Sequence, residues 1–246
     1  MSSASTIESF ARTIGLVERG LRSVLEEPSR RALYEVASQL KGSGDAWAYE
    51  VYPKQPLRFK PTIIDRIQLQ ADIICDIAGN SATSPILTRQ NLVVRVWSLD
   101  SAVSYRSNMD SMDIQEQLAK QDYRRVMLRY HFDEIISDQN GPDFHLQVGG
   151  SPEYEEFCWL HKSIGVPRIA FPPMDLILAC ELVTANFFPD LYFKLKNDPE
   201  WMSAVQKSED LFQRPYFESR MNMLNAREGS RADTLLSSCW RFRIGP

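Results

Sequence analysis

The side chains with the clearest chemical potential lie in residues 124–149, where His131, Asp133 and His145 stand among alternating apolar residues. Two imidazoles and a carboxylate can bind a transition metal, and a histidine oriented by an aspartate can act as a general base near neutral pH. Neither His-x-Asp nor His-x-Gln is a signature motif, and antiparallel sheets routinely carry polar residues on their outer face without a catalytic role. A catalytic or divalent-metal site here is therefore one hypothesis, and an ordinary polar strand face is the simpler interpretation.

The alternation in this stretch predicts two antiparallel strands, because successive side chains of a strand point to opposite faces. The turn signal Asn140-Gly141-Pro142 separates the two runs. Residues directly opposite in an antiparallel pair share a face, so burial of both apolar sets brings the polar residues together. The expected buried residues are Val126, Leu128, Tyr130, Phe132, Phe144, Leu146 and Val148, and the expected polar cluster is Arg129, His131, Asp133, His145 and Gln147.

Residues 66–73 alternate in the same way and predict another strand, with Ile67, Leu69, Ala71 and Ile73 inward and Arg66, Gln68, Gln70 and Asp72 outward. Planar guanidinium groups suit phosphate or carboxylate, so a small-ligand or nucleotide-binding face is a further hypothesis. Asp72 is also a possible fourth ligand of the metal site. The candidate binding residues are Arg66, Gln68, Gln70, Arg129, Gln147 and Arg168.

Two further polar residues have alternative interpretations. Arg168 precedes a predicted helix, where it could bind an anion near the helix N-terminus, but a surface pair with Asp175 or Glu155 is the preferred interpretation. His161 is expected to be an ordinary, partly exposed histidine rather than a ligand.

The composition is ordinary for a globular protein: 43% of the 246 residues are hydrophobic and 24% are charged. A formal charge of −4 argues against a surface covered in nucleic-acid-binding residues, although a local basic patch remains compatible with it. The four cysteines are Cys75, Cys158, Cys180 and Cys239, whose wide spacing suggests reduced, buried thiols rather than a zinc site or disulfide framework. With no signal peptide or membrane-spanning run, the cytoplasm is the expected location.

The order of expected elements predicts a single α+β domain over residues 1–246. Residues 1–44 form an amphipathic helical hairpin, residues 45–150 form an antiparallel meander of about four or five strands, and residues 151–246 are mainly helical. Residues 101–122 interrupt the strands as a Ser-rich, acidic insertion, expected to be a mobile flap or partner loop. The helices are expected to pack on the sheet.

Four short motifs carry a resemblance that covers about residues 124–190: Arg129-Tyr130-His131-Phe132-Asp133, Phe144-His145-Leu146-Gln147-Val148-Gly149, Pro167-Arg168-Ile169 and Pro172-Pro173-Met174-Asp175. They resemble uncharacterised small bacterial proteins found beside phage-defence or mobile-element genes, a resemblance that transfers no catalytic residue. Apolar helical stripes, exposed aromatics and an insertion loop are typical of interfaces. The leading hypothesis is therefore a non-catalytic docking subunit of a larger bacterial intracellular complex, ahead of a metal-dependent hydrolase or nuclease and of a ligand-binding module.

Overall fold

The computed structural model describes residues 3–41, 45–81, 87–99, 125–134, 141–149, 168–225 and 240–241. The first elements are the helices α1 (Ser3–Leu21) and α2 (Glu27–Leu40). The strands that follow are β1 (Ala46–Val51), β2 (Leu57–Arg58), β3 (Thr62–Ile64), β4 (Ile67–Asn80), β5 (Leu87–Ser98), β6 (Arg125–Glu134), β7 (Gly141–Pro142), β8 (Phe144–Val148) and β9 (Ile169–Ala170). The last elements are α4 (Leu176–Phe187), α5 (Pro189–Leu195), α6 (Pro199–Ser208), the π-helical turn η1 (Glu209–Gln213), α7 (Arg214–Asn225) and β10 (Trp240–Arg241).

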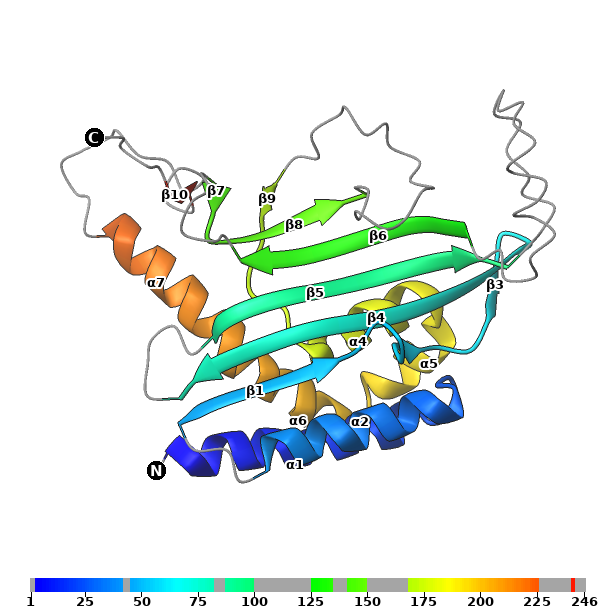
Figure 1. The fold of residues 1–246 in the computed structure, drawn as a ribbon, viewed down its shortest axis with the longest axis horizontal. Helices are drawn as coiled ribbons and strands as arrows, with labels where there is room; N and C mark the ends of the chain where they lie inside the picture. Colours follow the sequence, from blue (N-terminus) through cyan, green and yellow to red (C-terminus); the bar gives the residue numbers. More distant parts are fainter. Residues whose placement is uncertain are drawn as a thin grey trace.

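The fold is α+β, as the sequence predicted, and its centre is an antiparallel meander (Figure 1). The eight-stranded sheet has the order β1-β4-β5-β6-β8-β9, while β2 and β3 pair with β4 beyond the end of β1. It thus has more strands than the expected four or five, because β2, β3 and β9 are too short to show a periodic pattern. The expected strand over residues 66–73 is only the first half of the long strand β4.

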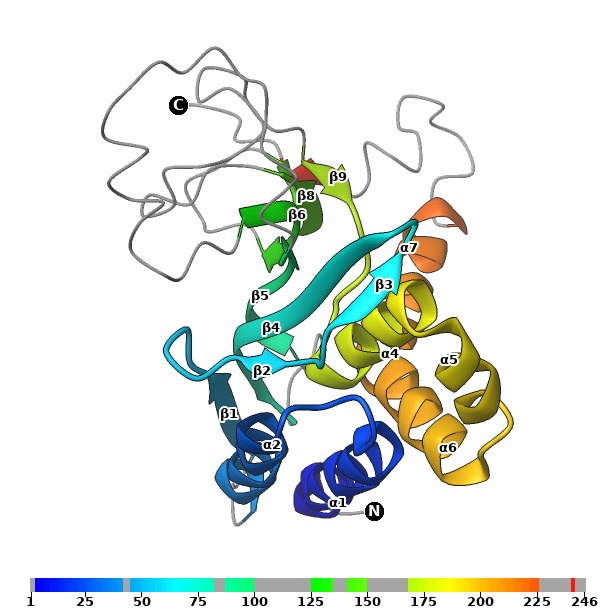
Figure 2. The same cartoon turned by 90° about the vertical axis from the view of Figure 1, so that its right-hand side faces the viewer.

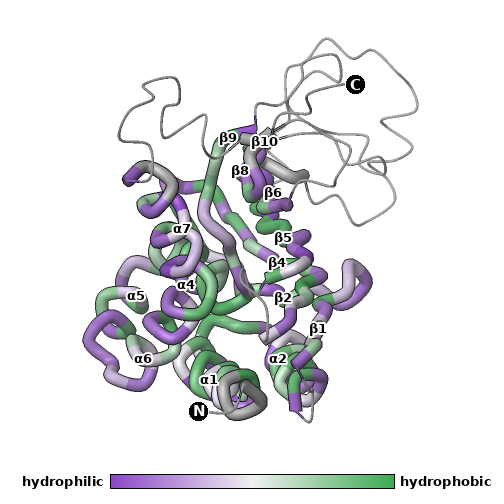
Figure 3. The backbone as a smooth tube through the Cα atoms, turned by 90° about the vertical axis from the view of Figure 1, so that its left-hand side faces the viewer, coloured by the Kyte–Doolittle hydropathy of each residue, from purple (hydrophilic) through white to green (hydrophobic). Residues whose placement is uncertain are grey.

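Helices α1, α4, α5 and α6 lie on one side of this sheet, and α2 lies beneath β1 (Figure 2). The core between the layers takes inward residues of the strands, such as Ile73 and Val94, and apolar residues of the helices, such as Ile14 and Cys180, all fully buried or nearly so. Figure 3 shows hydrophobic segments where the helices meet the sheet and hydrophilic turns on the outside of α5 and α6. We call the opposite side of the sheet the outer face.

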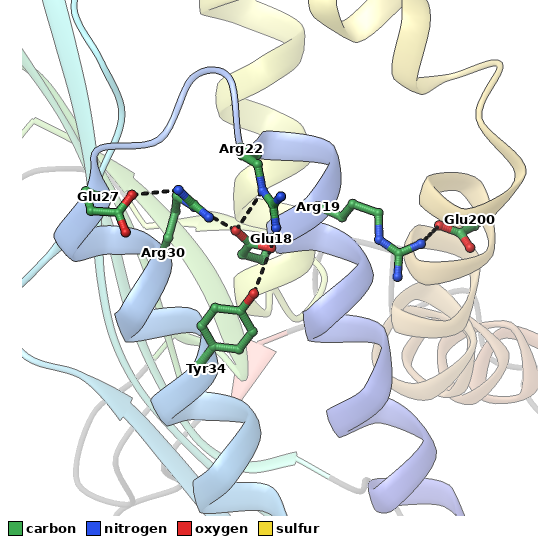
Figure 4. Close-up of polar contacts among 7 residues, drawn as sticks. All are labelled: Glu18, Arg19, Arg22, Glu27, Arg30, Tyr34 and Glu200. Carbon is green, nitrogen blue, oxygen red and sulfur yellow. Dashed lines mark hydrogen bonds and ion pairs between the residues drawn. The ribbon is translucent and has the colours of Figure 1, made fainter.

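The N-terminal helices form the expected hairpin, and a buried carboxylate joins them (Figure 4). Glu18 of α1 is 1% exposed and accepts hydrogen bonds from Arg22, Arg30 and Tyr34, at distances from 2.7 to 3.4 Å. Burial acts to raise the pKa of Glu18, but these hydrogen bonds outweigh burial and hold it below its usual value. The ion cluster therefore fixes how α2 crosses α1.

Two details of the C-terminal helices differ from the pattern of the sequence. Pro173 precedes α4 rather than occupying it, and the N-cap is Asp175, whose Oδ1 accepts from the Leu178 amide at 2.9 Å. Pro215 does not separate two helices: it lies directly after η1, where the Arg214 amide donates to the Glu209 carbonyl in the wider spacing of a π-helical turn. α6 runs through η1 directly into α7.

Several expectations fall on other parts of the chain. The insertion at residues 101–122, together with Glu155, Cys158, His161 and Cys239, lies outside the described residues. Cys75 of β4 and Cys180 of α4 are buried and carry free thiols, as expected of a reduced protein. In the described part of the chain, every helix is too short or too polar to cross a bilayer.

Candidate functional site

The predicted hairpin is present as the pair β6 and β8, and its register matches the alternation of the sequence. Phe132 faces Leu146, and His131 faces Gln147, so apolar residues pair with apolar residues and polar with polar. Asp133 faces His145 in the same register. His131, Asp133, His145 and Gln147 therefore share the outer face, as predicted, while Phe132 and Phe144 belong to the core.

The outer face is less exposed than the alternation suggested. His145 is 2% exposed and is therefore more deeply buried than the half-buried Leu146 on the apolar side. Val93, which faces His131 from β5, is 3% exposed. β5 is therefore buried on both faces at this point, and the polar residues of β6 and β8 form a half-buried cluster rather than a solvated surface.

The electrostatics of His131 and Asp133 differ from those of a general-base pair. Burial, the charge of Arg129 and the nearness of His145 lower the pKa of His131 to about 4, so its imidazole is neutral at pH 7. His131 Nε2 lies 3.1 Å from Asn91 Oδ1 and 3.7 Å from Asp133 Oδ2, so Asn91 is its hydrogen-bond partner. Burial raises the pKa of Asp133 to about 6, against the opposing effects of the Glu134 amide, Arg168 and Arg129. A histidine with so low a pKa is a poor proton acceptor at neutral pH.

The metal hypothesis finds no support in this geometry. Within the described ranges, no three His, Cys, Asp or Glu side chains are arranged to hold a metal ion. Asp72 cannot supply a further ligand, because β5 separates its strand from β6 and its carboxylate accepts from Arg95 at 2.8 and 3.0 Å and from Trp97 at 3.0 Å. Sharing a face therefore does not bring His131, Asp133 and His145 into a ligand set.

The binding face proposed around β4 is only partly correct. Arg66 lies in the exposed turn before β4 with a φ of 69°, and Gln68 is exposed near the start of the strand. Gln70 is 2% exposed and donates to Glu26 Oε1 at 2.6 Å and to the Phe59 carbonyl at 2.8 Å. The expectation that Gln70 and Asp72 face solvent is wrong, because these residues bind neighbouring parts of the fold.

The remaining three binding candidates do come together with the histidine residues. The pairing of Leu146 with Ile169 puts Arg168 beside Gln147 in the same register, and both Arg168 and Arg129 act electrostatically on Asp133. Asp175, considered as a partner of Arg168, is instead the fully buried cap of α4. We define the outer-face cluster as Arg129, His131, Asp133, His145, Gln147 and Arg168. Asn91, which the sequence did not indicate, positions the His131 ring within it.

A second candidate site is an open groove of about 600 Å³ along η1 and α7. Two large apolar side chains in it are exposed, Phe217 by 50% and Met221 by 54%. The groove is lined by Glu209, Asp210, Gln213, Arg214, Phe217, Glu218, Met221 and Asn222. Their spacing at three and four residues is a sequence signal for one helix face, although Pro215 lies within it.

The acidic residues give the groove a negative character. Arg214 Nε donates to Asp210 Oδ1 at 2.8 Å, so the arginine is balanced within the groove. Burial and the charge of Glu209 raise the pKa of Glu181 on α4, which shows that the negative field of Glu209 reaches the neighbouring helix. α7 itself is fixed to the sheet by Arg220, which pairs with Asp143 at 2.6 Å, and by Tyr216, which packs on Phe144.

Comparison of the chain with protein-family models, with curated proteins and with solved structures found no match.

Proposed function

We propose that this protein is a non-catalytic subunit that docks onto a larger bacterial intracellular complex by binding a basic, amphipathic segment of its partner along η1 and α7. The observation that carries the proposal is the combination of exposed Phe217 and Met221 with the carboxylates of Glu209 and Glu218 in one groove. Interface energy concentrates in large apolar anchors, and complementary charge steers the partner toward them.

The irregularity of the helix supports this role. A π-helical turn inserts one residue into the helical repeat, and such turns recur at functional sites. In this chain η1 contributes Glu209, Asp210 and Gln213 to the groove while Leu211 and Phe212 stay buried. η1 thus exposes polar groups to a partner, while Leu211 and Phe212 of the same turn stay packed in the core.

The resemblance of residues 124–190 to proteins beside phage-defence genes makes a bacterial antiphage assembly the setting we propose. A cytoplasmic location fits the free thiols of Cys75 and Cys180.

The test uses two synthetic helical peptides with the same leucine pattern, one carrying lysines and the other glutamates. Fluorescence anisotropy measures the binding of each peptide to the full chain. We expect the basic peptide to bind and the acidic one to fail. Phe217→Ser with Met221→Ser should weaken binding at least tenfold, which corresponds to about 1.4 kcal/mol. Ile63→Ser, at a 71% exposed side chain on β3, is the matched apolar control and should leave the affinity for the basic peptide unchanged.

Net charge needs its own control, since the chain carries a formal charge of −4 and any basic peptide is attracted to it. The pair Glu209→Lys and Glu218→Lys should abolish binding, while Glu8→Lys with Glu35→Lys makes the same change in charge at exposed positions of α1 and α2. If both pairs of lysine variants lost the same affinity for the basic peptide, or if the acidic peptide bound as tightly as the basic one, we would abandon the docking site.

A further inference from the structure

The residues that lead into α4 connect the sheet to the helices that carry the groove. The Met174 amide donates to Gln90 Oε1 of β5 at 2.8 Å. In the opposite direction, Gln213 Nε2 donates to the Pro173 carbonyl at 3.3 Å, and Gln213 lines the groove. The position of η1 relative to the sheet therefore depends in part on residues 173–175, which we call the entry segment of α4.

Asp175, the last residue of the entry segment, lies against the junction of α6 and η1. Ser208 ends α6 and is 0% exposed, as is Asp175. Burial raises the pKa of Asp175, and the Ser208 hydroxyl is the foremost group that acts in the other direction. Within the described ranges, however, neither Asp175 Oδ2 nor Ser208 Oγ has a hydrogen-bond partner of regular geometry. The neutral acid is therefore favoured here, because a buried carboxylate with an unsatisfied oxygen is costly.

Ser208 also leads from Asp175 toward the surface of the protein. The residues that follow it, Glu209 and Asp210, are exposed and line the groove. On its other sides Asp175 interacts electrostatically with groups of β1, β4 and α4, which are the buried Tyr49, Cys75 and Cys180 and the half-buried Glu181. Water would therefore reach Asp175 most directly through a movement of η1 away from α4.

We propose that Asp175 and Ser208 form a pH-dependent latch, which holds η1 against α4 while the Asp175 carboxyl is neutral and lets η1 open more often once it is ionised. The latch regulates the same groove, so its role rests on the proposed docking function. Burial raises the pKa of Asp175 to about 6 with the latch closed, whereas a hydrated aspartate has a pKa of about 3.9. Ionisation therefore favours the open latch, and the closed latch loses stability as the pH rises through about 6.

Hydrogen exchange followed by mass spectrometry tests the latch in the full chain, without a peptide. After correction for the intrinsic exchange rate, η1 should open about tenfold more often at pH 7 than at pH 5, while the amides of β4 stay protected. Asp175→Asn stays neutral and should open equally at both pH values. Glu181→Gln is the matched control, because it removes the neighbouring carboxyl of α4 but should keep the tenfold change. Ser208→Ala removes a group that lowers the pKa of Asp175, so the midpoint of the change should move to a higher pH.

The latch would be wrong if wild-type η1 opened equally at both pH values, or if β4 exchanged together with η1. It would also be wrong if Asp175→Asn kept the change, Glu181→Gln lost it, or Ser208→Ala left its midpoint in place. At about ten times its Kd, the basic peptide of the docking test should lower the opening of η1 about tenfold at pH 7, because it binds the closed groove. Binding without this protection would overturn the link between the latch and the groove. A peptide that does not bind would reject the docking role alone, since the exchange measurement decides the latch without it.

Discussion

Asp175 combines a capping role with complete burial, so its protonation is coupled to folding. Its side chain accepts from the Leu178 amide at the start of α4 and is 0% exposed. Burial raises the pKa of Asp175 to about 6, against the opposing effect of hydrogen bonds such as that from the Leu178 amide. Between about pH 4 and pH 6 the folded protein therefore holds a proton there that the unfolded chain, with an aspartate pKa of about 3.9, releases.

This raised pKa predicts a specific dependence of stability on pH. A group with a higher pKa in the folded state contributes stability below its unfolded pKa, and the contribution is lost as the pH rises through the folded pKa. Asp175→Asn keeps an acceptor at the cap but removes this linkage. We expect the difference in unfolding free energy between wild type and variant to change by about 2 to 3 kcal/mol between pH 4 and pH 7. Urea denaturation across this range measures it, and a constant difference would contradict the assignment.

Residue patterns predicted which face of a strand each side chain occupies but not what covers that face. The pairing of Phe132 with Leu146 and of His131 with Gln147 follows from alternation alone. The burial of Gln70 and Asp72 does not, because it depends on Glu26, Arg95 and other groups distant in the sequence. The weak basicity of His131 was equally hidden, since it comes mainly from burial, which depends on what covers this face of the strand.

At the scale of elements, α1 packs so closely on α6 that one glycine is required and another is not. A Cβ added to Gly20 would lie 3.0 Å from Trp201 Cε3 and 3.1 Å from Leu195 Cδ2, whereas one added to Gly15 would meet nothing within 4 Å. Both neighbours of Gly20 are buried, so they have little room to move.

The two glycines therefore respond in opposite ways to the same substitution. Gly15→Ala should stabilise the protein by about 0.5 to 1 kcal/mol, because alanine favours the helix. Gly20→Ala gains the same propensity but crowds Trp201, and we expect a net loss of about 1 to 2 kcal/mol. Thermal unfolding compares them directly. Stabilisation by both variants would mean that the contact between α1 and α6 is looser than described.

The connection of α1 to α2 offers a second contrast, between a buried ion cluster and an exposed ion pair (Figure 4). Glu18→Gln should destabilise the protein by about 2 kcal/mol at pH 7, because Arg30 loses its charged partner in a largely buried setting. Arg19 pairs with Glu200 at 2.6 Å, but both side chains are more than half exposed, so Arg19→Gln should cost under about 1 kcal/mol. Because the pKa of Glu18 is lowered, its contribution should fade as the pH falls below 4.5. If denaturant unfolding gave equal losses of unfolding free energy for Glu18→Gln and Arg19→Gln, the expected difference between the two contacts would be wrong.

The order of elements was predictable because long periodic segments dominate it. The helical hairpin and the antiparallel meander both follow from the spacing of apolar residues. The course of the chain around Pro215 was not predictable, since a proline inside a helical pattern usually ends or kinks the helix and η1 has no sequence signature. The groove along η1 and α7 depends on that continuity, so it was not predictable either.

On the scale of the whole molecule, the fold separates the two candidate sites. The groove belongs to the helices that cover one side of the sheet, and the outer-face cluster belongs to the other side (Figure 2). The shared core lies between them and takes residues from α1 to η1. A partner bound along α7 would therefore leave the outer-face cluster uncovered.

Cys75 and Cys180 provide an internal reporter of how this layered structure opens. One thiol belongs to the sheet and the other to α4, and burial raises the pKa of both. Thiol-reactive reagents modify a buried cysteine only when local opening exposes it to solvent. The labelling rate of each cysteine therefore measures the opening of its own layer. Because one core joins the layers, we expect mass spectrometry of the two labelled peptides to give equal rates under mild denaturation. Faster labelling of Cys180 would instead reveal a helical layer that detaches while the sheet remains intact.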